Sequence, residues 1–476
     1  MNGLTCIVEI WMMPRWSGFV WRGLRWLLRQ MIFEQCKGKL NVKRISTRML
    51  CYAGAVLFAM VAAACPFRSV GDGILHCYLT WQGDTSTTMT INYHAAPGGA
   101  QSAVYYDKVS RGGDPDAYVL QALGGAFEIP GLNAFAGAKR DVHAVKLTNL
   151  EPGQTYYFVA GDASTGFTQE KMFRTLPASG AVNFVTGGDM GTDNVVRSLL
   201  SQAALQSPYF GLIGGDVAYA NGRTTSWREW EKWLDNWESQ MVTPGGYTIP
   251  MVLAIGNHET NGGYGQFANP TNAAPFYFGY FAQEGTGFTQ ARSAYFDRWF
   301  GDKIRLFVLD SGHVTAIDGA QKTWLETELA ATPAGVLTFA LYHVPMYPSE
   351  RNFEDSAALR AAWRPAFDTY GLTAAFENHD HVQKRTKRLV NDTPNVNGTL
   401  YIGDGCFGRS PRPGRQAMDL ETSAELVALG LTENYLAAWD SRRHFWTVDV
   451  AADASTVDFN AIDGNGVVFD SYTLVP

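Results

Sequence analysis

The sequence predicts two folded domains of different class: an all-β sandwich over residues 66–176 and an α/β domain over residues 177–476. Short strands separated by Gly/Pro turns fill the first region, which is the pattern of a sandwich. Buried-type strands interleaved with helical stretches fill the second region, which is the pattern of an α/β fold. The length of 476 residues also exceeds what one domain usually needs.

The first domain is expected to form an antiparallel β-sandwich. Polar and apolar residues alternate in 88–93 and in 142–147, as in strands that bury one face. The spacing of Leu150, Pro152 and Tyr156 is that of a tyrosine corner, in which a phenol hydrogen-bonds back to the preceding crossing. This region resembles a fibronectin type III-like module. Trp81 and Tyr156 are therefore interpreted as core residues.

In the second domain, one apolar run after another stops at an Asp, Asn or His, often just after a glycine. The runs are 182–186, 209–213, 250–255, 304–309, 336–342 and 372–376. Because the carboxyl ends of strands in an open α/β sheet face one crevice, the polar residues that follow should converge there. These residues are Asp189, Asp216, Asn257, His343, His379 and His381.

Such a group of side chains predicts a metal site. Carboxylate, amide and imidazole donors suit hard to borderline cations rather than the soft ions that thiolates bind. A carboxylate can bridge two ions about 3.5–4 Å apart, as hydrolytic two-metal sites require. The chain beyond residue 65 carries a net charge of −14, because residues 1–65 hold nine Lys/Arg and two Asp/Glu. That body repels nucleic acid, so an anionic substrate would need the local positive charge of bound metal.

Five blocks of this region resemble the purple acid phosphatases, within the wider metallophosphoesterases. They are residues 188–191 (GDMG), 215–219 (GDVAY), 256–259 (GNHE), 340–343 (ALYH) and 378–381 (NHDH). Each block alone is weak evidence for the family, but five blocks in this order are a specific signal. The resemblance covers residues 77–476. It implies a calcineurin-like β-sandwich flanked by helices, behind the fibronectin-like domain.

The resemblance implies a role for each metal-ligand position. Asp189, Tyr219 and His381 would bind iron(III), and Asp216 would bridge to a second ion. Asn257, His343 and His379 would bind that divalent ion, which is zinc, manganese or iron(II). Tyr219 is the most diagnostic of these ligands, since a phenolate favours iron(III) and gives a visible charge-transfer band. The alternative for Tyr219 is an ordinary core tyrosine.

The resemblance also implies an acid phosphatase activity on small phosphate monoesters, by in-line attack of a metal-bound hydroxide. Asn257 and His258 would contact the phosphate, and His258 would protonate the leaving alkoxide. Glu259 would orient His258. The alternatives are a phosphodiesterase or nucleotide hydrolase on the same scaffold, or a catalytically dead adhesion or binding protein.

Three positions depart from the family pattern or are ambiguous. Asn378 replaces the usual glycine, so we expect it to adopt the glycine-like backbone angles of that turn. Arg351 follows the fourth block, where family members of plant type carry histidines, and could bind phosphate as a bidentate donor or lie in an exposed loop. His313 follows a strand end and could line the cleft, but a position on the loop surface is expected.

The front of the chain resembles a targeting sequence. Basic residues at 43–48, an apolar run over 50–64 and small residues before Cys65 form the layout of a secretory signal peptide. The closing Cys65 also resembles a lipoprotein cleavage site. The sequence therefore predicts a secreted, periplasmic or lipid-anchored protein that meets a membrane only through an N-terminal lipid or signal anchor. A disulfide between Cys77 and Cys406 is possible from the sequence.

Overall fold

The computed structural model describes residues 73–98, 101–135, 137–283, 292–403 and 405–476. The predicted targeting region 1–65, with Cys65, lies outside these residues. Within the described ranges, no helix has the length and apolar character needed to cross a membrane.

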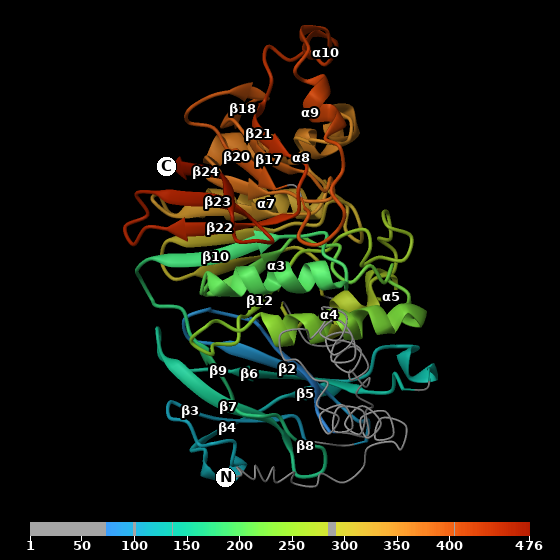
Figure 1. The fold of residues 1–476 in the computed structure, drawn as a ribbon, viewed down its shortest axis with the longest axis vertical. Coiled ribbons are helices and arrows are strands. Elements are labelled where there is room, and N and C mark those ends of the chain that lie inside the picture. The colour runs from blue at the N-terminus through green and yellow to red at the C-terminus, as the bar shows by residue number, and fades with distance from the viewer. Residues whose placement is uncertain (1–72, 99–100, 136, 284–291, 404) are drawn as a thin grey trace, which may run out of the picture. The chain divides into compact units, whose positions relative to one another are not determined.

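Two antiparallel sheets form the amino-terminal sandwich (Figure 1). One sheet has the order β1-β2-β6-β5, and the other has the order β4-β3-β7-β8 with β9 also paired to β7. The strands are β1 (Leu75–Thr80), β2 (Met89–Ala95), β3 (Ala103–Asp107), β4 (Leu120–Leu123), β5 (Gly125–Phe127), β6 (Asp141–Leu147), β7 (Thr155–Asp162), β8 (Gly166–Phe167) and β9 (Lys171–Arg174). Single 3₁₀ turns lie at Pro115–Ala117 and Leu132–Ala134. The predicted all-β sandwich is confirmed.

The predicted core residues of the sandwich are buried. Tyr156 is 2% exposed, and its hydroxyl accepts a hydrogen bond from the Glu151 backbone N–H at 2.9 Å, as a tyrosine corner requires. Trp81 is 1% exposed, and its ring packs edge-on against Phe210 and Phe300 of the second domain. One hydrophobic core therefore runs from the sandwich into the α/β region.

The second domain contains two mixed sheets, ordered β12-β11-β10-β22-β23-β24 and β13-β14-β15-β16-β20-β17-β21. The strands are β10 (Val182–Gly187), β11 (Phe210–Ile213), β12 (Met251–Leu253), β13 (Phe296–Phe300), β14 (Ile304–Val308), β15 (Leu337–Leu341), β16 (Ala374–Phe376), β17 (Gln383–Thr386), β18 (Leu389–Val390), β19 (Thr393–Pro394), β20 (Leu400–Gly403), β21 (Leu436–Asp440), β22 (His444–Val450), β23 (Val457–Asp463) and β24 (Val468–Leu474). Strands β10 to β12 run parallel to one another, as do β14, β15, β16 and β20.

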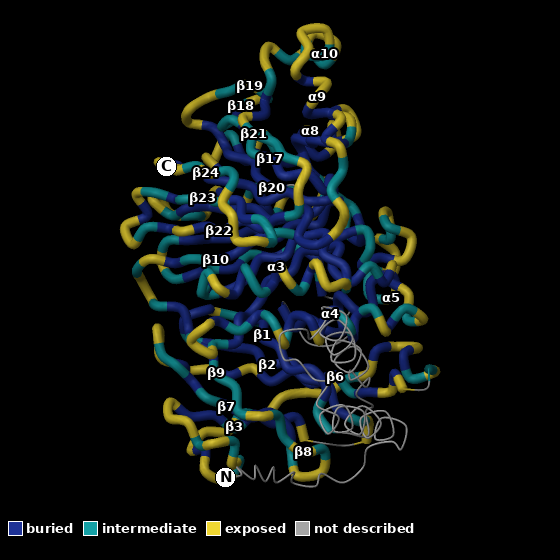
Figure 2. Tube along the Cα trace, viewed as in Figure 1, coloured by how far each residue is buried: buried dark blue, intermediate teal, exposed yellow. Residues whose placement is uncertain are grey.

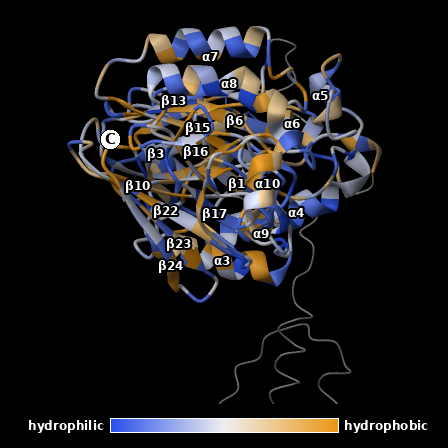
Figure 3. Ribbon diagram, turned by 90° about the horizontal axis from the view of Figure 1, so that it is seen from above, coloured by the Kyte–Doolittle hydropathy of each residue, from blue (hydrophilic) through white to orange (hydrophobic). Residues whose placement is uncertain are grey.

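Helices cover the outer faces of these sheets. Figure 3 shows α7 and α8 on one side and α3 on the opposite side, with the strands between them, and Figure 2 shows the buried strands inside. The helices are α3 (Asn194–Leu205), α4 (Trp227–Gln240), α5 (Pro270–Ala273), α6 (Pro275–Tyr280), α7 (Ala320–Ala330), α8 (Ala357–Tyr370), α9 (Arg415–Asp419) and α10 (Ser423–Ala428), with 3₁₀ turns at Thr224–Ser226 and Phe353–Ser356. Helix α4 buries four tryptophans, so the packing of this apolar face holds the helix in place. The predicted α/β sandwich flanked by helices is confirmed.

The two cysteines of the described residues do not form the disulfide that the sequence allowed. Cys77 and Cys406 are both buried and free. Cys77 lies in β1, whereas the Cys406 thiol follows β20 and donates to the Arg409 carbonyl.

Candidate metal centre and active site

The seven predicted metal-ligand side chains meet where parallel strands end. Strands β10, β11, β12, β15 and β16 are followed within a few residues by Asp189, Asp216, Asn257, His343 and His379. One ligand atom each from Asp189, Asp216, His343 and His379 lies within 4.8 Å of the others, and all four residues are buried. The strand-end pattern in the sequence therefore corresponds to a real cluster.

Asp189 is the centre of one half of this cluster. Its Oδ1 accepts a hydrogen bond from the Tyr219 hydroxyl at 3.2 Å and lies 2.9 Å from His381 Nε2. The Tyr219 hydroxyl is 3.3 Å from the same His381 nitrogen. Because His381 Nδ1 lies 3.2 Å from the Ser410 carbonyl, Nδ1 carries the proton and Nε2 offers its lone pair to the site.

Asp216 and His343 form the other half. His343 Nε2 is 3.3 Å from Asp216 Oδ2, 3.1 Å from Asn257 Oδ1 and 3.0 Å from His379 Nδ1. His343 Nδ1 donates to the Gly214 carbonyl at 2.8 Å, so its Nε2 is also turned inward as a lone pair. The two halves join at Asp189, whose Oδ2 accepts from the His379 backbone N–H at 2.7 Å.

The backbone of this site is held in an unusual conformation. Five of the seven predicted ligands have left-handed backbone angles with φ between 53° and 78°, namely Asp189, Asp216, Tyr219, His379 and His381. Non-glycine residues in that region each cost about 1–2 kcal/mol, and such strain concentrates at functional sites. The loops therefore turn sharply at the ligands themselves.

Asn378 does not adopt the glycine-like angles that we expected, because His379 and His381 take them instead. The Asn378 side chain donates through Nδ2 to the Tyr342 carbonyl at 3.1 Å and lies against Gly214. A Cβ on Gly214 would come within 1.8 Å of that amide nitrogen. The amide of Asn378 thus fills the space that a glycine at this position would leave.

The electrostatics of the cluster suit bound cations. Burial alone lowers the pKa of His343, but the carboxylates of Asp216 and Asp189 raise this pKa to about 9. Burial, and then Asp189, raises the pKa of the Tyr219 phenol far above its usual value. A cation bound beside His343 and Tyr219 would lower the pKa values of both groups. The carboxylate, imidazole, amide and phenol donors of the cluster therefore fit two metal ions of hard to borderline character.

His258 lies at the open side of the site, and Glu259 does not orient it as expected. The Glu259 carboxylate instead accepts hydrogen bonds from the backbone N–H groups of Asp216, Val217 and Gly256, at 2.7–2.9 Å. Burial, and then Asp216, raises the pKa of Glu259 to about 7. These hydrogen bonds join the loops of two predicted ligands, and among the described residues none of them reaches the His258 ring.

Asn221 takes the role expected of Glu259. Its side-chain oxygen contacts His258 Nδ1, so Nε2, which lies 3.8 Å from Asp216 Oδ2, is the nitrogen available to a substrate. The His258 backbone N–H also donates to Asp216 Oδ1 at 2.7 Å, and its ring lies over Tyr219 with 4.2 Å between centroids. The sequence contained a signal for Asn221, which follows Tyr219 by two residues on the same loop.

Arg351 lies at the rim beside the predicted ligands. Its Nη1 donates to the buried Asp380 carboxylate at 3.1 Å and to the His379 carbonyl at 3.3 Å, and 30% of its side chain is exposed. It is therefore not a freely exposed loop arginine. A contact of Arg351 with phosphate stays a prediction.

Three further side chains in the site were missed or misjudged. The Arg409 guanidinium lies 4.0 Å above the Tyr219 ring, and it follows β20, a strand end that the sequence reading passed over. The Tyr264 hydroxyl lies 3.2 Å from His379 Nε2. His313 is fully buried beside His343, so its expected surface position was wrong. Asp310 accounts for this, because its carboxylate accepts from the His313 N–H and pulls the loop inward.

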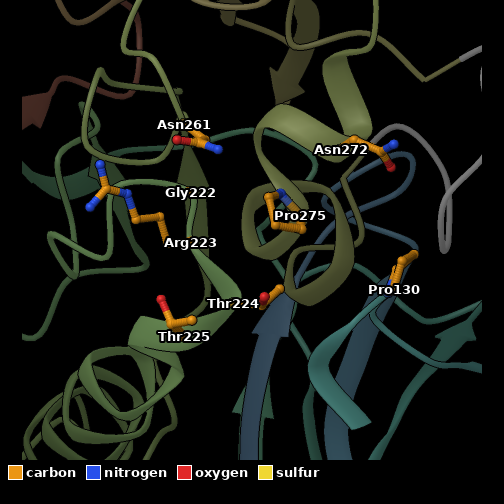
Figure 4. A pocket seen from close by; sticks show the side chains of 8 residues that line it. All are labelled: Pro130, Gly222, Arg223, Thr224, Thr225, Asn261, Asn272 and Pro275. Carbon is orange, nitrogen blue, oxygen red and sulfur yellow. The ribbon is translucent and has the colours of Figure 1, made fainter. Parts of the chain in front are cut away.

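A polar cavity of about 510 Å³ adjoins the loop that carries Asn221 (Figure 4). Its lining combines the sandwich with the second domain and consists of Pro130, Gly222, Arg223, Thr224, Thr225, Asn261, Asn272 and Pro275. No predicted site residue is among them.

Parallel strands whose ends gather Asp, Asn and His side chains that could hold metal ions are the arrangement expected of a metallophosphoesterase. Comparison with known families agrees: a calcineurin-like phosphoesterase model matches residues 141–383, and a model of the purple acid phosphatase N-terminal domain matches residues 74–175. The chain belongs to the calcineurin-like phosphoesterases, as a purple acid phosphatase-like member.

Known relatives are distant. Purple acid phosphatase 15 of Arabidopsis thaliana is 25% identical over 298 residues, which is 56% of this chain and 53% of that protein. Purple acid phosphatase 22 of the same plant is 24% identical over 67% of this chain and 69% of that protein. The chain thus spans about half the length of the first relative. Among solved structures, the yellow lupin purple acid phosphatase PPD1 superimposes with a TM-score of 0.66 at 17% identity, covering 85% of this chain and 74% of that one, which supports the fold.

Proposed function

We propose that this protein is an exported acid phosphatase that hydrolyses phosphate monoesters at a binuclear metal centre. The observation that supports the proposal is the meeting of all seven predicted ligand side chains at one set of strand ends. In this proposal Asp189, Tyr219 and His381 hold iron(III) and Asp216 bridges. The divalent zinc, manganese or iron(II) ion is held by Asn257, His343 and His379.

The residues around the centre would divide the work of the reaction. When bound, the ions supply positive charge for the phosphoryl oxygens and acidify water. His258, held through Nδ1 by Asn221, would give its Nε2 proton to the departing alkoxide. About 34% of the His258 side chain is exposed, so a substrate can reach it. Asn257 and Arg351 would bind phosphate oxygens.

Metal removal and reloading test this proposal directly. The purified protein would be stripped with a chelator and reloaded with iron alone, with iron plus zinc or manganese, and with zinc alone. The proposal expects hydrolysis of 4-nitrophenyl phosphate below neutral pH only after iron is restored, either alone as iron(III) with iron(II) or together with zinc or manganese, and it expects a visible absorption band in the active protein. Full activity with zinc alone, without any band, would contradict the iron(III) assignment.

Substrate class needs its own comparison, since phosphodiesters can react on the same scaffold. The rate with 4-nitrophenyl phosphate would be measured against that with bis(4-nitrophenyl) phosphate on the same reloaded protein. A higher kcat/KM for the monoester supports the proposal, and a higher value for the diester favours the phosphodiesterase alternative. A metal-loaded protein inactive on both would indicate a binding protein.

Export rests on the leader sequence and has a separate test. Expression of the full chain followed by cell fractionation should place the mature protein outside the cytoplasm. Mass spectrometry of its new N-terminus should find cleavage near residues 61–65. A cytoplasmic protein that retains residues 1–60 would overturn this part of the proposal.

A further inference from the structure

A second cluster of side chains that could hold a metal ion, made of residues outside the active site, lies between the sandwich and helix α4. His76 comes from β1, His94 from β2 and Glu231 from α4, which contacts β1. One ligand atom from each lies within 4.8 Å of the others, and all three residues are buried. Residues separated by up to 155 positions in the chain are thus brought to one point.

The local structure of β1 and α4 aims these groups at one another. The β1–β2 ladder has an irregularity between Leu75 and Cys77, and His76 sits there with a left-handed φ of 48°. A bulge of this kind redirects a side chain, here towards α4. On α4, Glu231 and Asp235 are four residues apart and so share one face. His76 Nε2 lies 3.3 Å from Glu231 Oε2, and His76 Nδ1 lies 3.5 Å from Asp235 Oδ1.

The hydrogen bonds of His94 leave a lone pair unused. The Tyr78 hydroxyl donates its single proton to the Tyr280 carbonyl at 2.6 Å, so it must accept from His94 Nε2, 3.1 Å away. His94 is fully buried, and burial favours the uncharged form of its ring. Its Nδ1 therefore bears a lone pair, and among the described residues this buried atom has no hydrogen-bond partner.

We propose that His76, His94 and Glu231 bind one zinc ion that fastens helix α4 to the sandwich. Two zinc bonds of about 2.0–2.1 Å at a tetrahedral angle separate their ligand atoms by about 3.3 Å. The distance from His76 Nε2 to Glu231 Oε2 is 3.3 Å. Two histidines and one carboxylate are also an established donor set for zinc, with a fourth position left for water.

Each ligand has a partner that fixes its other polar atom. Asp235 faces His76 Nδ1, Tyr78 faces His94 Nε2, and Arg140 pairs with Glu231 Oε1. Such outer partners orient the ligands of metal sites and set the protonated nitrogen of each histidine. The Asp235 side chain is 63% exposed, so the site borders solvent and an ion can enter there.

The competing interpretation is a protonated His76 between two carboxylates, with no metal. That arrangement satisfies His76, Glu231 and Asp235, but it leaves the buried His94 lone pair without a donor. An unmade buried hydrogen bond of this kind costs about 1–3 kcal/mol. A zinc ion satisfies all three ligand atoms at once, so the geometry favours the metal.

The test is the amount of zinc bound by the full chain. Wild-type protein, His94→Gln and the control His143→Gln would be dialysed against zinc, and metal per chain would be measured by mass spectrometry. His143 is a matched control, because it is a buried, neutral histidine of the same sandwich, stacked on Tyr93. His94→Gln should hold one zinc fewer than wild type, and His143→Gln should match wild type.

The expected difference is one zinc ion per chain, whether or not the binuclear centre also binds metal. A failure of the zinc proposal can therefore be distinguished from a failure of the proposed phosphatase function. Equal zinc in wild type and His94→Gln would overturn the inference. The exposed Asp235→Asn gives a second measurement in a variant whose folding is not at risk. Its zinc affinity, from competition with a coloured chelator, should fall roughly 10–100-fold. An unchanged affinity in Asp235→Asn would also overturn the proposal.

Discussion

Replacing Glu259 by glutamine separates a structural anchor from a catalytic helper. Glu259 Oε2 accepts from the backbone N–H groups of Asp216 and Gly256, and Oε1 accepts from that of Val217. In the Glu259→Gln variant, the amide oxygen can keep the first two bonds. The amide nitrogen then faces the Val217 N–H, so two donors meet and one buried N–H is left unpaired.

The expected loss of unfolding free energy in Glu259→Gln follows from these contacts. A buried donor left without an acceptor costs about 1–3 kcal/mol, and the bond that is lost was made to a charged group. Burial of the ionised carboxylate, which raises the pKa of Glu259 to about 7, partly offsets that loss. We expect a net destabilisation of about 2 kcal/mol, which lowers the urea midpoint by about 0.7 M for an m-value of about 3 kcal/mol/M.

The assay compares two variants by two measurements. Urea unfolding of the metal-free protein reports stability, and kcat of the reloaded protein reports the chemistry. Glu259→Gln should lower the urea midpoint and weaken metal binding, since it loosens the loops of Asp216 and Asn257. Asn221→Ala, which frees the His258 ring, should leave the midpoint within about 0.2 M and lower kcat about 10–100-fold. A Glu259→Gln variant with wild-type stability and metal content but reduced kcat would refute this reasoning.

Three further predictions concern the site and the core. Tyr219→Phe should abolish the visible band of the iron-loaded protein, and a surviving band would mean that another ligand is the chromophore. Arg409→Met removes the cation 4.0 Å above the Tyr219 ring, so the band should move to longer wavelength; an unmoved band would show that the cation does not act on the phenolate. Trp81→Ala should cost about 3–5 kcal/mol in urea unfolding, because this ring packs against Phe210 and Phe300 of the second domain. Loss of the sandwich in a separate transition, with the second domain unaffected, would contradict a shared core.

Much of the active site was predictable from local patterns. Each predicted ligand follows an apolar strand, and the carboxyl ends of parallel strands meet by geometry, so Asp189, Asp216, Asn257 and His343 could be placed without coordinates. Tyr156 and Trp81 were likewise identified as core residues from strand spacing.

Contacts between loops were not predictable in this way. Asn221 rather than Glu259 holds His258, Arg409 lies over Tyr219, and His313 is buried, because these positions depend on how each loop turns after its strand. The left-handed angles fell on His379 and His381 rather than Asn378, since the Asn378 amide is used to fill space beside Gly214.

The sequence by itself determined the class of each domain, the family and the polar residues that gather at the strand ends, because those features depend on residue spacing along one strand and its following turn. Only the tertiary structure decided which side chains support the predicted ligands. It alone brought His76 and His94 of the sandwich to Glu231 of helix α4, because such a meeting depends on how two separately formed elements pack, and no local pattern records it.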